Sequence, residues 1–441
     1  MTPEEPRHRQ TSATLSRVRK ARNADLESKG SFRSMPRPEV VELLVPVGDE
    51  SSPELSIVIP AMDEELTISD FLAWCREGLE RAGVRGEILI VDSSADRTPE
   101  LALALGARVL RVPKRGLGRA YIDAIPFIRG RWVLMGDADC TYDFRQLGEF
   151  VDALRSGADF VMGSRWKGSI EKGAMPPHHQ YFGTPFTTWI LNRVYSTHFT
   201  DIHCGMRAMT LDSLISMDIQ SQSWEYASEI VIKSILLDLQ TTEVPVHFLK
   251  DREGRVSHHK RMGWFSPFQA AWINLRAMFV YGSDFFLLWP GAILFIIGFL
   301  LTGATTIGPV DLGIVELSLS SQFLGVILAI MGLQSVLLGC TSRTFFDYTG
   351  RRSAPIARLF PYNRTVAIAF AIFLIGIAMC VPLVVIFIGN DLSLSTIGAE
   401  NHLALSGLFL VASGFLLFVF TLVINGALAA RAELTHARSA R

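Results

Sequence analysis

The sequence has few cysteines and almost no net charge. Its five cysteines, at positions 75, 140, 204, 340 and 380, show no spacing typical of metal ligands, so we expect them to be reduced and structural. Lys and Arg number 42 against 43 Asp and Glu, and the resulting net charge of −1 argues against a nucleic-acid-binding protein. The N-terminal region also lacks the apolar core of a signal peptide.

Lys and Arg are absent from four long apolar stretches in the second half of the chain. Each holds the roughly 20 apolar residues that are needed to cross a bilayer. Helices buried in a large soluble core are the alternative, but four such stretches in succession, joined by short loops, disfavour it. The sequence therefore predicts an all-α membrane domain with spans near Phe285–Gly308, Phe323–Ser342, Thr365–Ile388 and Leu403–Ile424.

The loops around these stretches differ in positive charge. The loop between the second and third spans carries five Arg residues and three more follow the fourth span, whereas the other two loops carry no Lys or Arg. By the positive-inside rule, the arginine-rich loop and both chain termini face the cytoplasm. We therefore expect a multi-pass protein of the plasma (inner) membrane whose remaining domain is cytoplasmic.

The chain before the membrane spans alternates between short apolar runs and amphipathic stretches. Runs such as Leu55–Pro60 and Trp132–Met135 predict strands with helices between them, which indicates an α/β domain with a mostly parallel sheet and helices on both faces. The amphipathic stretch Tyr181–Thr197 fits an interfacial helix and a core-facing helix equally well. The predicted organisation is a disordered basic tail at 1–50, a cytoplasmic domain that would carry the chemistry at 54–260, an interfacial amphipathic helix at 261–284, four membrane helices at 285–428 and a cytoplasmic tail at 429–441.

Acidic residues follow several of the predicted strands. The carboxyl ends of parallel strands meet at one edge of a sheet, where α/β folds bind ligands, so such carboxylates could hold a nucleoside. Any one of them could instead cap a helix or a turn, as Asp96 could. Several in register are hard to explain by capping alone. The acidic residues in question are Asp63, Glu64, Asp92, Asp137 and Asp139.

Asp137 and Asp139 stand one residue apart at the end of a buried strand. Mg²⁺ and Mn²⁺ prefer oxygen ligands and often share them with a substrate phosphate. Arg115 and Gly118 follow the preceding strand, where a guanidinium could neutralise a diphosphate and glycine lets the backbone approach closely. A lone Asp-x-Asp pair is more often a solvated strand end, but together these motifs predict a metal–diphosphate site with Asp137 and Asp139 as metal ligands.

The order and spacing of these motifs resemble those of family-two glycosyltransferases with the A-type nucleotide-sugar fold. Within that family the chain is most similar to dolichyl-phosphate mannose synthases and bacterial polyprenyl-phosphate glucosyltransferases. The motifs that carry the resemblance are Val58-Ile59-Pro60-Ala61 with Glu64, Val91-Asp92, Gly116-Leu117-Gly118-Arg119, Asp137-Ala138-Asp139, Gly163-Ser164-Arg165, Asp201 with Gly205-x-Arg207, and Glu243-Val244-Pro245 followed by Arg252 and Ser257.

The resemblance also implies a role for each matching residue. Catalytic roles fall to Asp137, Asp139, Asp201 and Arg207. The donor nucleotide would be bound by Pro60, Ala61, Asp63, Glu64, Asp92, Arg115, Gly118, Asp137 and Ala138. The acceptor phosphate would be bound by Arg165, Arg207, Arg252, Ser257, His258 and Lys260.

The predicted reaction is the inverting transfer of one hexose to a polyprenyl phosphate at the cytoplasmic leaflet, with UDP-glucose favoured as donor and GDP-mannose second. Such a phosphate is already an anion and needs no general base. One alternative is a processive polysaccharide synthase, whose Thr-Glu-Asp and Gln-x-x-Arg-Trp motifs do not occur in this sequence. The other is a lipid flippase or transporter with a nucleotide-sugar sensor domain, which would place ionisable residues inside the spans. The sequence leaves the oligomeric state open and allows a homo-oligomer.

Overall fold

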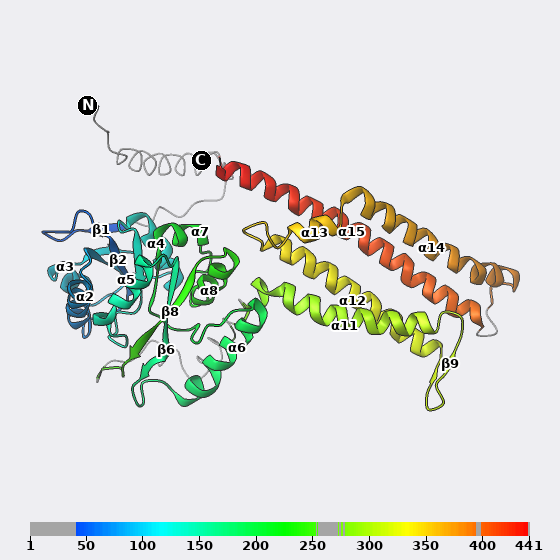
Figure 1. Ribbon diagram of the computed structural model, residues 1–441, viewed down its shortest axis with the longest axis horizontal. Coiled ribbons are helices and arrows are strands. Elements are labelled where there is room, and N and C mark those ends of the chain that lie inside the picture. Colours follow the sequence, from blue (N-terminus) through cyan, green and yellow to red (C-terminus); the bar gives the residue numbers. More distant parts are fainter. Residues whose placement is uncertain are drawn as a thin grey trace, which may run out of the picture. The chain divides into compact units, whose positions relative to one another are not determined.

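The computed structural model describes residues 41–252, 254, 272, 275–276, 278–393 and 398–439 (Figure 1). Most of the predicted N-terminal tail and most of the predicted interfacial helix at 261–284 lie outside the described residues. Within the predicted tail, however, Glu42–Leu44 forms strand β1, which pairs with β4 in antiparallel orientation. The apolar run around Leu43 and Leu44 supplies side chains suited to a strand, so the predicted tail extends too far toward residue 50.

One sheet of eight strands forms the core of the domain that precedes the membrane helices. Its order is β1-β4-β3-β2-β5-β7-β6-β8. Strands β4, β3, β2 and β5 are parallel to their neighbours in this group, β6 is parallel to β8, and β7 is antiparallel to both β5 and β6. The strands after β1 are β2 (Leu55–Ala61), β3 (Gly86–Asp92), β4 (Arg108–Arg111), β5 (Trp132–Met135), β6 (Phe160–Ile170), β7 (Arg207–Thr210) and β8 (Thr241–Phe248).

Helices pack against this sheet and bury its central strands. Ile57, Ile90 and Leu134 are fully buried, which explains why β2, β3 and β5 read as continuous apolar runs. The mixed sheet with flanking helices confirms the predicted α/β fold class (Figure 1). The helices are α2 (Ile68–Ala82), α3 (Thr98–Ala104), α4 (Leu117–Ala124), η1 (Ile125–Phe127), η2 (Phe144–Gln146), α5 (Gly148–Arg155), η3 (His179–Gly183), α6 (Thr184–Tyr195), α7 (Leu211–Met217) and α8 (Tyr226–Leu236).

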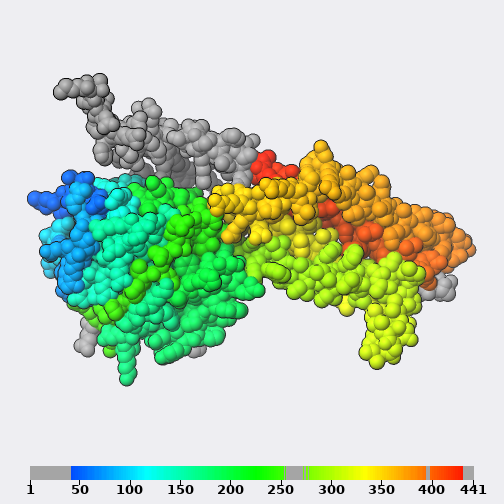
Figure 2. All heavy atoms as spheres, viewed as in Figure 1, coloured from blue at the N-terminus to red at the C-terminus, as the bar shows by residue number. Residues whose placement is uncertain are grey.

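Four helices of the second half are long and apolar enough to cross a membrane, as the sequence predicted. They are α11 (Ser283–Ala304), α12 (Leu319–Phe345), α14 (Tyr362–Gly389) and α15 (Ala399–Ser439). Helix α11 packs on α12, α14 packs on α15, and α12 contacts α15 (Figure 2). Between them lie a short hairpin of β9 (Val310–Asp311) and β10 (Glu316–Leu317), and helix α13 (Ala354–Leu359) in the arginine-rich loop.

Glycine lets α11 and α12 approach closely. A β-carbon added at Gly298 would lie 2.2 Å from the backbone nitrogen of Ala329, and one at Gly332 would lie 2.2 Å from that of Phe295. Small residues at helix contacts are typical of membrane helices, where close backbone packing replaces the hydrophobic effect. The chain is therefore a multi-pass membrane protein with an α/β domain ahead of its spans.

Candidate active site

The carboxyl ends of β4, β3, β2 and β5 lie next to one another. Strand β2 pairs in parallel with both β3 and β5, with Ala61 opposite Asp92 and Val58 opposite Met135. Strand β3 pairs in turn with β4, where Asp92 lies opposite Arg111. The fold therefore brings the predicted strand-end residues to one edge of the sheet, which is the edge where open α/β sheets bind ligands.

Hydrogen bonds hold together the two loops that follow β2 and β3. The Asp63 N–H donates to Ser94 Oγ (2.8 Å), and the Ala95 N–H donates to Asp63 Oδ1 (3.0 Å). The Glu64 N–H donates to Thr98 Oγ1 (2.9 Å). Asp63 has a φ of 58°, a backbone conformation that Asp and Asn tolerate better than most residues. This geometry favours a role for Asp63 in shaping the loop.

Asp92 is a fully buried carboxylate whose two oxygens differ in their hydrogen bonds. Its Oδ2 accepts hydrogen bonds from Arg111 Nη1 (2.6 Å) and from the Ser94 N–H (3.3 Å). Its Oδ1 is buried and has no hydrogen-bond partner in the part of the chain that the structure describes. Burial raises the pKa of Asp92, although Ser94 and Arg111 oppose the shift. An acceptor buried without a partner is costly, which points to a donor supplied by a ligand.

Arg111 is a residue of this edge that the sequence analysis did not single out. It is the last residue of β4, and the parallel register places it directly opposite Asp92. Its side chain is 38% exposed, so it holds Asp92 from the solvent side. The sequence did offer one signal for Arg111: like the acidic residues, it stands at the end of a predicted strand.

Asp137 and Asp139 follow β5 at the same edge. Asp139 Oδ1 accepts hydrogen bonds from the N–H (3.0 Å) and the hydroxyl (2.6 Å) of Thr141, so one of its oxygens shapes the turn. A β-carbon added at Gly205 would lie 2.6 Å from Asp137 Oδ2, so the glycine leaves the space that this carboxylate occupies. The Gly205 N–H donates to the Tyr142 hydroxyl (2.8 Å), which fixes the glycine there.

The donor set at this position suits a hard divalent cation. No cluster of three or more His, Cys, Asp or Glu that could hold a metal ion alone occurs among the described residues. Mg²⁺ typically takes one or two carboxylates and completes its octahedron with substrate phosphates and water. Asp137, in the space left by Gly205, and Asp139 fit that requirement.

The remaining donor candidates lie around the same edge. Pro60 and Ala61 end β2, and Ala138 is buried between the two aspartates. Arg115 lies near the end of the loop before α4 and forms an ion pair with Asp123 on that helix (2.8 Å). Its side chain is one-third exposed, which leaves it accessible to an anion.

Gly116, the last residue of that loop, and Gly118, in the first turn of α4, lie against the segment that precedes α8. A β-carbon added at Gly116 would lie 2.3 Å from the carbonyl oxygen of Gln222, and one at Gly118 would lie 2.2 Å from that of Ser221. Gly116 also has a φ of 114°, which strongly favours glycine. The two backbones therefore meet with no side chain between them.

Asp201 and Arg165 form a buried bidentate ion pair. Arg165 Nε lies 2.6 Å from Asp201 Oδ2, and Nη2 lies 2.8 Å from Oδ1. The guanidinium also lies 5.2 Å from the centroid of the Phe248 ring. His203, which the sequence analysis did not single out, donates its backbone N–H to Asp201 Oδ1 (3.2 Å). Burial lowers the pKa of His203 to about 4, so this histidine is neutral near pH 7.

Arg207 is turned into the protein. Its guanidinium donates to the carbonyl oxygens of Cys204 (2.8 Å), Ala227 (2.6 Å) and Ile202 (3.2 Å). Only 1% of the residue is exposed. Because carbonyl oxygens engage all three nitrogens, this arrangement favours a structural role over contact with an acceptor phosphate.

Arg252 lies on the surface, where its charge acts on Cys140, the residue after Asp139. It forms an ion pair with Asp70 in the first turn of α2, and 41% of its side chain is exposed. Burial raises the pKa of Cys140 to about 12, and the nearby charge of Arg252 opposes that shift while Asp139 adds to it. The other predicted acceptor contacts, Ser257, His258 and Lys260, lie outside the described residues.

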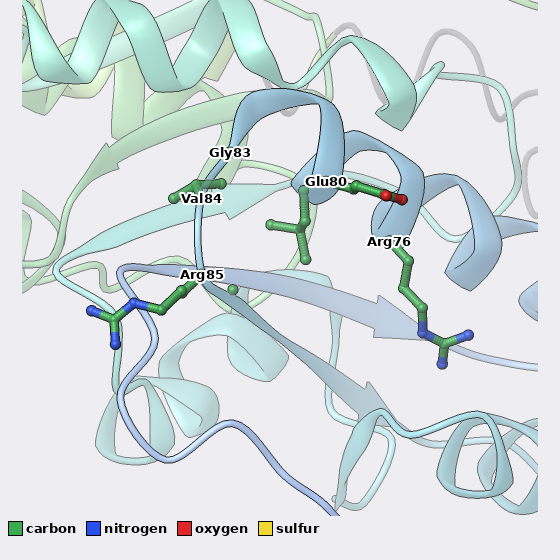
Figure 3. Close-up of a pocket in the computed structure, with 7 residues that line it drawn as sticks. Arg76, Glu80, Gly83, Val84 and Arg85 are labelled. Carbon is green, nitrogen blue, oxygen red and sulfur yellow. The ribbon is translucent and has the colours of Figure 1, made fainter.

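A shallow surface depression lies elsewhere on the domain. Strand β3 begins at Gly86, which lines the depression, and ends at Asp92, so the depression is at the opposite edge of the sheet from the site. The charged side chains of Arg76 and Arg85 point apart around it (Figure 3), and we assign it no ligand. Its lining residues are Arg76, Leu79, Glu80, Gly83, Val84, Arg85 and Gly86.

Comparison with known proteins identifies the family. The Glycosyl transferase family 2 domain matches residues 56–216, and the Glycosyltransferase family 2 C-terminal transmembrane region matches residues 340–426. The chain is 34% identical over 342 residues to the low-salt glycan biosynthesis hexosyltransferase Agl6 of Haloferax volcanii, an alignment that covers 76% of this chain and 81% of that protein. The chain is a family 2 glycosyltransferase.

A second relative of this glycosyltransferase supports the same assignment, and a solved structure shows a weak similarity. A dolichyl-phosphate hexose transferase of Haloferax volcanii is 29% identical over 204 residues, which cover 46% of this chain and 85% of that protein. Glucosyl-3-phosphoglycerate synthase from Mycobacterium tuberculosis, solved with Mn²⁺ and UDP-glucose, is 20% identical with a TM-score of 0.38 over 49% of this chain and 76% of that chain. A structural similarity of that extent supports no argument about the site. The family resemblance predicted from the motifs is confirmed.

Proposed function

We propose that this glycosyltransferase moves one hexose, with inversion, from a nucleotide-sugar to a polyprenyl phosphate at the cytoplasmic leaflet. The observation that carries the proposal is the row of carboxylates at one sheet edge in a chain with four helices that are long and apolar enough to cross a membrane. One of these carboxylates, Asp92, has a buried oxygen without a hydrogen-bond partner among the described residues. The relative named as a dolichyl-phosphate hexose transferase supports a lipid phosphate as acceptor. UDP-glucose is the favoured donor and GDP-mannose the second.

The donor nucleoside would lie over the ends of β2 and β3. Asp92 Oδ1 is a buried acceptor that a base N–H or a ribose hydroxyl would satisfy, while Arg111 keeps the other oxygen in place. Pro60 and Ala61 would line the same end of β2, with Asp63 and Glu64 fixing the loop above. Residues 115–119, which include Arg115, Gly118 and the first turn of α4, form what we call the glycine loop. The glycine loop and the buried Ala138 would lie along the diphosphate.

Asp137 and Asp139 would hold Mg²⁺ or Mn²⁺ against the donor diphosphate. When bound, such a cation neutralises the charge that develops on the leaving diphosphate. The hydrogen bond from Thr141 orients Asp139. Gly205, which has no side chain, leaves room for the carboxylate of Asp137. These residues therefore orient the leaving group so that the acceptor attacks from the opposite side, which inverts the anomeric carbon.

The acceptor phosphate needs cations rather than a base. Arg252 is half-exposed at the Asp139 end of the site, and its fork can meet two phosphate oxygens at once. Arg165 is oriented by Asp201 and would act from the other side of the site. Arg207 would contribute indirectly, by holding the backbone carbonyl groups to which its guanidinium donates. Ser257, His258 and Lys260 stay proposed contacts near the membrane.

An aromatic surface near the first span supports a site at the membrane. Tyr181, Phe182, Phe186 and Trp189 of η3 and α6 are 76%, 68%, 45% and 61% exposed, and Phe186 stacks on Phe182 and on Trp189. Arg193, further along α6, lies 5.9 Å from the ring of Phe285 in α11. An exposed aromatic row beside the start of a span is typical of a helix at the membrane interface, which is one of the two roles predicted for this stretch.

The decisive test is an assay with labelled nucleotide-sugar and undecaprenyl phosphate in membranes that contain the full chain. A lipid-linked monosaccharide would support the proposal. A long polymer would indicate a processive synthase, and no product with any UDP- or GDP-hexose would favour a sensor or transporter. A panel of UDP- and GDP-sugars in the same assay identifies the donor.

We expect Arg252→Ala to raise the KM for polyprenyl phosphate about ten- to a hundredfold, because a charge-assisted hydrogen bond to phosphate is lost. Nucleotide affinity, measured by calorimetry, should stay unchanged. Arg252→Lys should rescue only part, since it keeps the charge and loses the fork. Asp70→Asn is the matched control, because it removes the ion-pair partner and leaves Arg252 in place. Tenfold weaker nucleotide binding with normal lipid dependence would assign Arg252 to the donor.

The orientation of the spans gives a second prediction. In a chain without its native cysteines, Asp311→Cys in the β9–β10 hairpin should react with an impermeant thiol reagent from outside, and Arg351→Cys only after the membrane is opened. The reason is the arginine-rich loop, whose Arg351 also forms an ion pair with Asp238 just beyond α8 (3.1 Å). Labelling of Arg351→Cys from outside would reverse the proposed topology.

A further inference from the structure

Helix α8 carries a buried ion pair that the proposed chemistry does not use. Lys233 Nζ lies 2.6 Å from Glu229 Oε1, one helical turn away, and the two side chains are 3% and 0% exposed. Removing two charges from water is costly and offsets their mutual attraction, so a buried pair is weak evidence for stability. The presence of this buried pair is therefore better explained by the contacts that its two side chains make.

Both charges hold the segment that precedes α8. Glu229 accepts the N–H of Gln220 on Oε1 (2.9 Å) and the N–H of Ser221 on Oε2 (2.8 Å). Lys233 Nζ donates to the carbonyl oxygen of Asp218 (2.8 Å). The pair therefore fixes three backbone groups of residues 218–221, using ionised partners that make strong hydrogen bonds.

The other side of this segment contacts the glycine loop at the start of α4. The Arg119 N–H donates to the carbonyl oxygen of Gln222 (3.0 Å). The carbonyl oxygens of Ser221 and Gln222 fill the positions where β-carbons of Gly118 and Gly116 would lie. Because the two backbones touch without an intervening side chain, a shift of the segment displaces the loop directly.

The pair also contacts residues that flank the membrane helices. The hydroxyl of Tyr281, two residues before α11 begins at Ser283, donates to Glu229 Oε1 (3.2 Å). The rings of Tyr281 and Tyr348 each lie 5.9 Å from Lys233 Nζ, and Tyr348 follows the end of α12 at Phe345. The same two charges thus connect the ends of two spans to the loop that we assign to the donor.

We propose that Glu229 and Lys233 are positioning residues that set the donor loop, and that the Tyr281 hydroxyl makes donor affinity depend on how the first membrane helix is placed. This inference rests on the proposed function, because the glycine loop must bind the donor diphosphate. Its consequence is that a change at the membrane end of the network alters donor affinity while the acceptor side is unaffected.

Tyr281→Phe tests the proposed connection between the first membrane helix and the donor loop, because it removes only the hydroxyl that donates to Glu229. The ring, its place beside Lys233 and its packing on Phe346 all stay. In the full chain in nanodiscs, we expect the Kd for UDP or GDP, whichever binds wild type, and the donor KM to rise about fivefold, a typical size for coupling between sites. The acceptor KM and the kcat should not change. Glu229→Gln should raise the donor KM further, because it removes the charge and one acceptor oxygen.

Tyr195→Phe is the matched control. Its hydroxyl is buried, has no hydrogen-bond partner among the described residues, and lies beside Gly282, next to Tyr281. It should leave both the donor and the acceptor KM at wild-type values. A lower kcat or unfolding midpoint for Tyr281→Phe with an unchanged Kd would make the pair merely structural and overturn the inference. Calorimetry needs no acceptor, so this result differs from failure of the proposed function, in which wild type binds neither UDP nor GDP.

Discussion

Asp139→Asn is expected to lower kcat/KM for hexose transfer about a thousandfold or more, the effect of removing a main source of charge stabilisation at a leaving group. Asn keeps an oxygen that can accept the two hydrogen bonds from Thr141, so the turn after β5 is retained. The change therefore removes the negative charge with little effect on the backbone. Initial rates with labelled nucleotide-sugar, measured across Mg²⁺ and Mn²⁺ concentrations, report the loss.

Thr141→Val separates the metal role of Asp139 from its role in the turn. It removes the hydroxyl hydrogen bond (2.6 Å) and keeps the carboxylate, so turnover should fall by less than about tenfold. Excess EDTA should abolish the activity of the wild-type enzyme, and added Mg²⁺ or Mn²⁺ should restore it. Full activity in EDTA, or an Asn variant within tenfold of wild type, would contradict a metal on Asp139.

The edge of the sheet could be predicted from the sequence because its strands are buried on both faces. Such strands read as continuous apolar runs, and the first polar residues after them mark the carboxyl end. Asp92 lies opposite Ala61 in the register, so the ends of two strands that are separate in the sequence form one edge of the sheet. The same reasoning could have included Arg111, which ends β4, but a basic residue at a strand end was not weighed as a partner of an acid.

The direction in which a charged side chain points could not be predicted. Arg207 and Arg252 both occur in family motifs, yet one donates to three carbonyl oxygens inside the protein and the other forms an exposed ion pair with Asp70. Strand β7, which begins at Arg207, was also missed, because four residues with one charge carry too little periodicity. Its antiparallel insertion between β5 and β6 depends on contacts between distant segments of the chain.

All four candidate membrane helices of the described residues were predicted, because a bilayer demands length and apolarity from the chain alone. The predicted first span, Phe285–Gly308, overlaps α11 at Ser283–Ala304. What the sequence could not give is the network that joins the spans to the site. Glu229 and Lys233 read as an ordinary helical i,i+4 pair, and only the fold shows that they are buried.

Asp201→Ala is expected to destabilise the protein by about 3–5 kcal/mol, because it leaves the guanidinium of Arg165 buried without a counter-charge. The unfolding midpoint in detergent should fall accordingly, and transfer activity should be lost with it. This single change does not separate folding from chemistry, since Asp201 also accepts the backbone N–H groups of Arg165 (3.1 Å) and His203 (3.2 Å).

The double variant Asp201→Ala/Arg165→Met makes that separation. It removes both charges, so the unfolding midpoint should recover part of the way, short of wild type because the two N–H groups still lack their acceptor. Turnover at low lipid concentration should stay far below wild type, because the proposed guanidinium contact to the acceptor phosphate is gone. The KM for polyprenyl phosphate and the Kd for nucleotide, measured on the folded double variant, then locate the defect: a raised lipid KM with unchanged nucleotide affinity is expected. If turnover returns together with stability, Arg165 serves only to hold Asp201, and the acceptor site must be built from Arg252 and the residues that follow it.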